Sequence, residues 1–110
     1  MGIRLGASRV QFAAIDAATS GDNTLVAGSA GNQIIVLNYL LVAGGTVNAT
    51  FSDGTTAFSG AIPLVANGGA SFPGDVDSPA FKVTEGEDLI LELDAAIQVS
   101  GHLAYLVVPV

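Results

Sequence analysis

The sequence predicts an all-β fold, an antiparallel β-sandwich of jelly-roll or Greek-key type with about eight to ten short strands. Two observations favour this class. Gly, Asn, Asp and Ser interrupt the chain about every six to twelve residues, and short apolar runs fill the intervals. In the longest of them, at 33–43, β-branched and aromatic residues are frequent and glycines bracket the run, which disfavours a helix. The 110 residues contain no linker, which indicates one domain at 10–110 after an N-terminal arm at 1–9.

The longest strand candidate in the first half of the chain is hydrophobic on both faces. Strands are expected at residues 10–15, 24–27, 33–43 and 46–52. In the third of these, strict alternation assigns Ile34, Val36, Leu40 and Val42 to one face, and Ile35, Leu37, Tyr39 and Leu41 to the other. Antiparallel sheets usually have one wet face. This strand is therefore expected to be central and covered, or to contribute to a subunit interface.

The second half of the chain continues the pattern of short strands and turns. Asp53-Gly54 is the strongest turn signal, and Pro63 indicates an edge strand or a strand end. Gly101 lies in the middle of the last run, which predicts a bulge or a close approach of backbone. The strands expected here are 55–59, 61–66, 70–72, 81–83, 88–94 and 97–108.

Composition and charge exclude several classes of function. The chain carries three Lys and Arg against ten Asp and Glu, for a net charge of -7, so it cannot neutralise a phosphate backbone or dock on an anionic membrane. It has no Cys, which excludes disulfides, thiolate zinc sites and thiol catalysis. No apolar run is long enough for a membrane-spanning helix. Hydrophobic residues are 50% and charged residues 12%, so some apolar surface is expected to need a partner.

Catalytic and metal-binding signals are weak. His102 is the only histidine, and no Gly-x-Ser-x-Gly elbow surrounds any serine, so we expect His102 to be a strand residue on an outer face. Asp75 and Asp77 form a D-x-D pair that fits a solvated acidic loop better than a calcium site. Acidic residues at 85–88 surround a tight turn. The sequence therefore predicts no enzyme, with no catalytic, cofactor-binding or metal-binding residue.

Positive charge is concentrated at the N-terminus. Arg4 and Arg9 lie in the arm, whereas the rest of the chain is acidic apart from Lys82. Such an arm is expected to dock on an acidic partner or lie across a neighbouring subunit, and the alternative is an ordinary frayed terminus. The residues predicted to dock are Ile3, Arg4, Leu5 and Arg9.

Several segments resemble small virion proteins of tailed bacteriophages. The similarity covers roughly residues 24–108 and consists of turn-and-strand patterns. The segments are GNQIIVLNY (31–39), FSDGTT (51–56), GAIPL (60–64), ANGG (66–69), TEGEDL (84–89) and VSGHLAY (99–105). The resemblance implies a β-sandwich that decorates (cements) a capsid, or a β-sandwich module of a head or tail fibre.

Composition and resemblance together predict a structural protein of a virion. We expect a capsid decoration protein on the outer capsid surface, made in the host cytoplasm, that self-associates as a homotrimer or a dimer and bridges subunits of the major capsid protein. Closed symmetry would bury the surplus apolar surface. The residues predicted for self-association are Ile35, Leu37, Tyr39, Leu41 and Tyr105.

Two other functions stay open at this stage. A fibre-associated module would bind a host glycan or protein, and Asn48, Asn67 and Tyr39 are the hints of such a site. A small hydrolase would need His102, a serine and a carboxylate within hydrogen-bond reach of one another.

Overall fold

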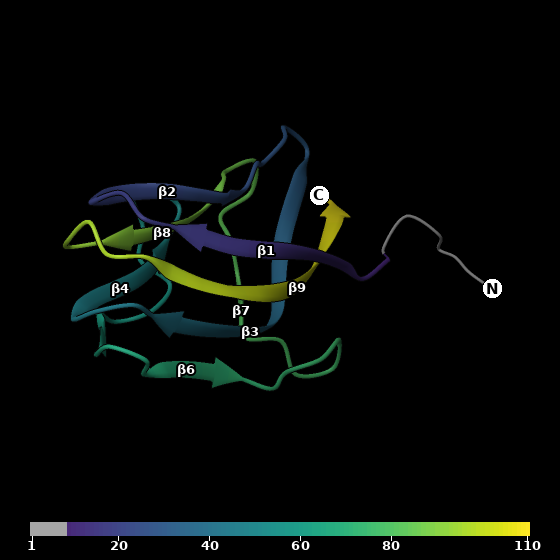
Figure 1. Cartoon of the computed structure of the whole chain (residues 1–110). Helices are drawn as coiled ribbons and strands as arrows, with labels where there is room; N and C mark the ends of the chain where they lie inside the picture. The colour runs from purple at the N-terminus through teal and green to yellow at the C-terminus, as the bar shows by residue number, and fades with distance from the viewer. Residues whose placement is uncertain (1–8) are drawn as a thin grey trace.

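The computed structural model describes residues 9–110, and over this range the chain forms two antiparallel sheets without a helix (Figure 1). The predicted all-β sandwich is confirmed, and the number of strands lies within the predicted range. In this part of the chain no helix is long and apolar enough to span a membrane. The nine strands are β1 Gln11–Ala17, β2 Gly21–Val26, β3 Asn32–Ala43, β4 Val47–Ser52, β5 Ile62–Leu64, β6 Gly69–Phe72, β7 Phe81–Lys82, β8 Leu89–Leu93 and β9 Val99–Pro109.

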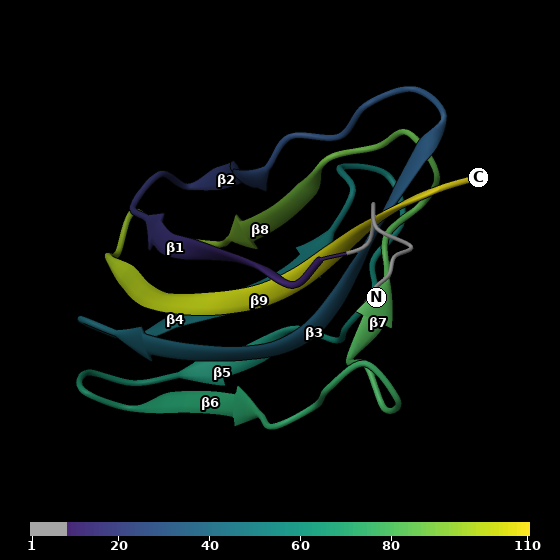
Figure 2. The ribbon, with the colours of Figure 1, turned by 90° about the vertical axis from the view of Figure 1, so that its right-hand side faces the viewer.

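The strand order is that of a jelly roll. One sheet has the order β1-β9-β3-β6, with β7 also paired to β3, and the other has the order β2-β8-β4-β5. Figure 2 shows β1, β9, β3 and β6 following one another across the first sheet. Strands from the first half of the chain thus pair with strands from the second half in reverse order, β1 with β9, β2 with β8, β3 with β6 and β4 with β5. This nesting brings the first and last strands side by side and forms two Greek keys in one sandwich.

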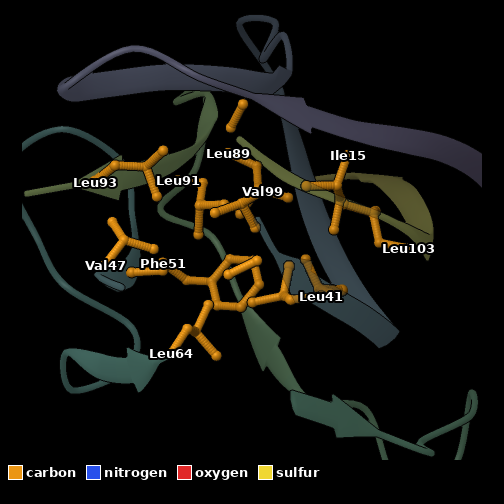
Figure 3. Close-up of a cluster of buried hydrophobic side chains, with 14 of the residues drawn as sticks. Ile15, Leu41, Val47, Phe51, Leu64, Leu89, Leu91, Leu93, Val99 and Leu103 are labelled. Carbon is orange, nitrogen blue, oxygen red and sulfur yellow. The ribbon is translucent and has the colours of Figure 1, made fainter. Parts of the chain in front are cut away.

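The main core lies between the two sheets and centres on Phe51. Its ring centroid lies 4.7 Å from that of Tyr39 and 5.2 Å from that of Phe81. Leu89, Leu91 and other aliphatic side chains of both sheets surround it (Figure 3). Clean alternation in the sequence of β4 and β8 predicts that six side chains point inward, and all six are buried: Val47, Ala49, Phe51, Leu89, Leu91 and Leu93.

Strand β3 contains a β-bulge that reverses its faces. Its register against β9 shifts between Val36 and Asn38. Val36 is buried before the bulge and Leu41 after it, while Leu40 is 39% exposed and Val42 is 41% exposed. The strict alternation predicted for residues 33–43 is therefore wrong beyond Val36, since one extra residue moves every later side chain to the opposite face. Figure 1 shows the two halves of β3 running in very different directions.

Three local predictions have clear outcomes. Residues 55–59 are not a strand, because the Asp53 carboxylate accepts the backbone N–H groups of Thr55 and Thr56 and holds a tight turn, leaving one bridge between Ser52 and Ala57. Pro63 lies on β5, at the edge of its sheet, as predicted. Gly101 is a close backbone approach, as predicted, since a β-carbon there would overlap the carbonyl oxygen of Leu40.

Candidate interaction surface

The outer face of the four-stranded sheet is polar and acidic. On β2, β8 and β4, Asp22, Glu92 and Thr50 form one row across the strands. Asp94 and Asn48 extend this polar row toward the end of the sheet. The alternation of β4 and β8 explains the pattern, because the apolar partners of these residues point into the core.

The outer face of the five-stranded sheet carries several exposed apolar side chains, with Asp16, Ser71 and Ser100 among them. Phe12 of β1 is 78% exposed and lies opposite Ala104 of β9. In the next row, Ala14, His102 and Leu40 lie side by side on β1, β9 and β3. Exposed aliphatic and aromatic side chains are normal one at a time, but here they are contiguous. We define the apolar face as Phe12, Ala14, Leu40, Val42, His102 and Ala104.

A second, smaller cluster continues this apolar surface past the bulge. Leu37, Ala104 and Leu106 are buried together, and Ile35 and Val108 pack against them. The cluster is separate from the main core because the bulge and the alternation of β9 direct these side chains to the opposite side of the sheet. Ala104 belongs to both the cluster and the apolar face, so the two are continuous.

The structure places the residues predicted for self-association in two different parts of the sandwich, the outer cluster and the main core. Ile35 and Leu37 belong to the outer cluster. Tyr39 and Tyr105 pack against the main core, and the Tyr105 hydroxyl donates a hydrogen bond of 3.3 Å to Gln11 Oε1. Leu41 is fully buried in the main core, so in this fold it contacts no partner. Self-association itself stays a prediction.

The residues predicted to dock on a capsid belong to the N-terminal arm. Ile3, Arg4 and Leu5 lie outside the described residues. Arg9 is exposed and lies just before β1. The predicted docking role of these residues stays a prediction.

Sequence reasoning missed Phe12, Leu40 and Val42 as surface residues. The sequence contains a signal for Phe12, because strand alternation places it on the same face as polar Asp16 and on the opposite face from Ile15. For Leu40 and Val42 the only hint was polar Asn38 inside the apolar run. His102 was placed correctly on an outer face, where it is exposed between Ala14 and Leu40.

Two of the acidic candidates of the sequence, Asp75 and Asp88, have structural roles. Asp75 Oδ1 accepts the backbone N–H groups of Asp77 and Ser78, each at 3.0 Å, and so closes its own loop. Asp88 Oδ1 accepts the N–H of Gly28 at 2.7 Å. Over residues 9–110, no three His, Cys, Asp or Glu side chains are grouped so as to hold a metal ion.

An open pocket of about 190 Å³ lies on the polar face and is lined by Asn48, Thr50, Ala61, Glu92, Leu93 and Asp94. Asp94 accepts the backbone N–H of Asn48 at 2.8 Å and its side-chain amide at 2.7 Å. These two bonds hold the pKa of the Asp94 carboxyl below its usual value, because they stabilise the charged form. Glu92 accepts the Ser52 hydroxyl at 2.6 Å.

Comparison of the chain with solved structures gives a weak similarity. No protein-family model and no curated protein matches the chain. Among solved structures, the chain is similar to a protein of the Bacillus endospore appendages, which form a novel family of disulfide-linked pili, at 18% identity and a TM-score of 0.49. The alignment covers 100% of this chain and 96% of that one. That neighbour is a pilus protein and not a phage virion protein.

Proposed function

We propose that the chain is a non-enzymatic structural subunit of a virus particle, a capsid decoration protein that self-associates and bridges neighbouring subunits of the shell. One observation supports this most directly: the two outer faces of the sandwich differ, one apolar and one acidic. A lone subunit gains nothing from a contiguous apolar face, whereas a subunit of an assembly buries it. The acidic face then stays in water and keeps the subunit soluble before assembly.

Bridging would act as a clamp. Phe12 alone leaves roughly 150 Å² exposed, taking about 200 Å² for a whole phenylalanine side chain. Burying a whole phenylalanine side chain is worth about 1.5–3 kcal/mol, so covering the exposed part of Phe12 contributes at most about 2 kcal/mol to an apolar contact. Many modest contacts of this kind on one shell add up, because each oligomer binds through several sites at once. Separating two bridged shell subunits would pull the copies of the oligomer apart and re-expose this surface.

Co-sedimentation with the source particle tests the proposal. We expect the full chain to pellet with particles stripped of it, and cryo-electron microscopy of the reconstituted particle to show its density on the outer shell. Phe12→Asp should weaken the binding at least tenfold, while Val65→Asp, which changes an exposed residue outside the apolar face, should not. Absence of this chain from the shell, or its density on a fibre, would refute capsid decoration.

A second function is favoured by the pocket on the polar face. In this alternative the chain is a module of a head or tail fibre that binds a host glycan, whose hydroxyl groups suit the carboxylates and amide of Asn48, Glu92 and Asp94. A glycan array with the full chain tests it. A hit that disappears with Thr50→Lys, which fills the pocket, would support the alternative, and an array without hits would reject it.

A further inference from the structure

We propose that a second copy of this chain covers the apolar face, and that the two copies bind only while both His102 side chains are uncharged. The inference rests on the proposed function, because it names the surface and the regulation of self-association. Three properties of the face lead to it, namely its charge, its area and the position of its imidazole.

Charge favours the apolar face over the rest of the surface as a contact between copies. Each copy has a net charge of -7, so two copies repel each other in most orientations. The strands of this sheet direct few charges outward. Asp16 lies at the end of β1 and Lys82 on β7 beyond the bulge, and the described parts of β3, β6 and β9 add no charged side chain besides His102. Approach through this face therefore brings together two nearly neutral surfaces.

The area of the apolar face is of the size expected for a weakly bound dimer. Four strands about 4.8 Å apart and five residues long, at about 3.3 Å a residue, span roughly 19 by 17 Å. This projects to about 320 Å² for each copy, and because the corrugated side chains expose more area than the projection, two copies would bury on the order of 1,000 Å² at most. That value is near the lower limit for a specific interface. Phe12, the largest exposed side chain of the face, is the natural anchor of the contact.

His102 lies inside the face and not at its rim. Its neighbours across the sheet are Ala14 on β1 and Leu40 on β3, and Ala104 lies two residues further along β9. Asp16 of β1 is the nearest acidic residue in register, one row of outward residues away. A neutral imidazole can be covered by apolar side chains at small cost, whereas an imidazolium would lose its hydration without a partner.

The direction of the pH effect follows from this placement. Lowering the pH favours the charged imidazolium form of histidine over the neutral form. A contact that accepts only the neutral form therefore weakens as the pH falls from about 7.5 to about 5.5. Ordinary carboxyl groups change little over this interval, so the overall negative charge does not mask the effect.

Sedimentation velocity of the full chain at both pH values tests the inference. We expect a dimer near pH 7.5 that dissociates on lowering the pH to 5.5. His102→Gln should remain dimeric at both pH values, and His102→Lys should be monomeric at both. Phe12→Ala should weaken the dimer at least tenfold. Val65→Ala is the matched control, since Val65 is exposed outside the apolar face. Thermal unfolding of each variant checks that it is folded.

Several outcomes would overturn the inference. These are a wild-type monomer at every concentration, a dimer that is insensitive to pH, or an unchanged pH response in His102→Gln. A dimer that Phe12→Ala does not weaken would place the contact elsewhere. A wild-type monomer that still binds the shell would reject this contact and leave decoration standing. A pH-dependent dimer that does not bind the shell would reject decoration alone.

Discussion

At the scale of single residues, the fold depends on Gly101, which has no β-carbon, and on Asp53, whose carboxylate accepts backbone hydrogen bonds. Gly101 lies in the middle of β9, where the backbone of β3 at Leu40 comes near, and its φ is +156°. Asp53 is almost buried at the β4 turn, where its carboxylate accepts two backbone N–H groups at 2.8 and 2.6 Å. One residue allows the sheet to form, and the other closes a turn at the end of β4.

Gly101→Ala is expected to destabilise the fold by at least about 2 kcal/mol. The new methyl group would overlap the carbonyl oxygen of Leu40, and a backbone atom cannot move aside as a flexible side chain can. Gly60→Ala is the matched control, because a β-carbon there meets nothing within 4 Å. Urea denaturation measures both. Equal stability of the two variants would contradict the close approach.

Asp53 is expected to make stability depend on pH in the acid range. Hydrogen bonds from the Thr56 N–H, the Thr84 hydroxyl and the Thr55 N–H hold the pKa of its carboxyl below the usual 3.8. The folded pKa is thus below the unfolded one, so the stabilisation is present above about pH 4 and is lost as the pH falls through the folded value.

Thermal unfolding between about pH 6 and pH 2.5 measures this effect. Asp53→Ser keeps a hydroxyl that can accept hydrogen bonds in the turn but removes the charge, so its melting temperature should fall less with pH than that of the wild type. Asp77→Ser, at an exposed carboxylate in another loop, should retain the wild-type slope. Identical slopes for Asp53→Ser and the wild type would exclude the carboxylate as the source.

At the scale of elements, the bulge in β3 determines which surface the chain presents. It turns Leu40 and Val42 outward and brings Leu41 into the core. It also bends the strand, so that one long strand serves two parts of the sheet (Figure 1). The apolar residues of 33–43 are as hydrophobic as the sequence predicts, but their division between inside and outside differs from simple alternation.

Alanine substitution of two adjacent leucines tests whether the bulge reverses the faces of β3. Leu41→Ala should lower stability by about 2–5 kcal/mol, since it leaves a cavity in the main core. Leu40→Ala should change stability by less than about 1 kcal/mol and instead weaken self-association. Chemical denaturation and sedimentation measure the two effects. A larger loss of stability for Leu40→Ala than for Leu41→Ala would mean that the faces are not reversed.

Most strands were predictable from sequence for one reason. The turn residues and short apolar runs mark β4, β5, β8 and β9 closely, because local chemistry alone decides where such strands end. The prediction of a strand at 55–59 was wrong, because the side chain of Asp53 accepts backbone N–H groups that a strand would donate to its neighbour. The interaction surface was only partly predictable, since assigning it depends on the pairing register of β3 with β9.

At the scale of the whole molecule, the apolar face and the large negative charge have opposite effects on self-association. The apolar face favours contact between copies, and the net charge of -7 opposes it. Because the apolar sheets face each other in a pair of copies, both outer sides of the pair present acidic sheets to water. A decoration protein with this arrangement would resist non-specific stacking on its exposed side.

Salt is expected to strengthen self-association. Raising the ionic strength from about 0.01 M to about 1 M shortens the screening length from about 30 Å to about 3 Å, which removes repulsion between copies but leaves apolar contact intact. Sedimentation equilibrium should show a dissociation constant that falls by about tenfold over this range. A dissociation constant that rises with salt would indicate ion pairs at the contact instead.

The amino-acid sequence alone was sufficient for the all-β class, the turn positions, the alternation of β4 and β8, and the surplus of apolar residues, because each depends on neighbours in the chain. Which of those apolar residues face outward was decided by tertiary structure. The bulge of β3 arises from its pairing with β9, since Tyr105 and Ala104, the partners of Val36 and Asn38, lie far along the chain. Register between distant strands is a property of the folded sheet, and a shift of one residue exchanges its inside for its outside.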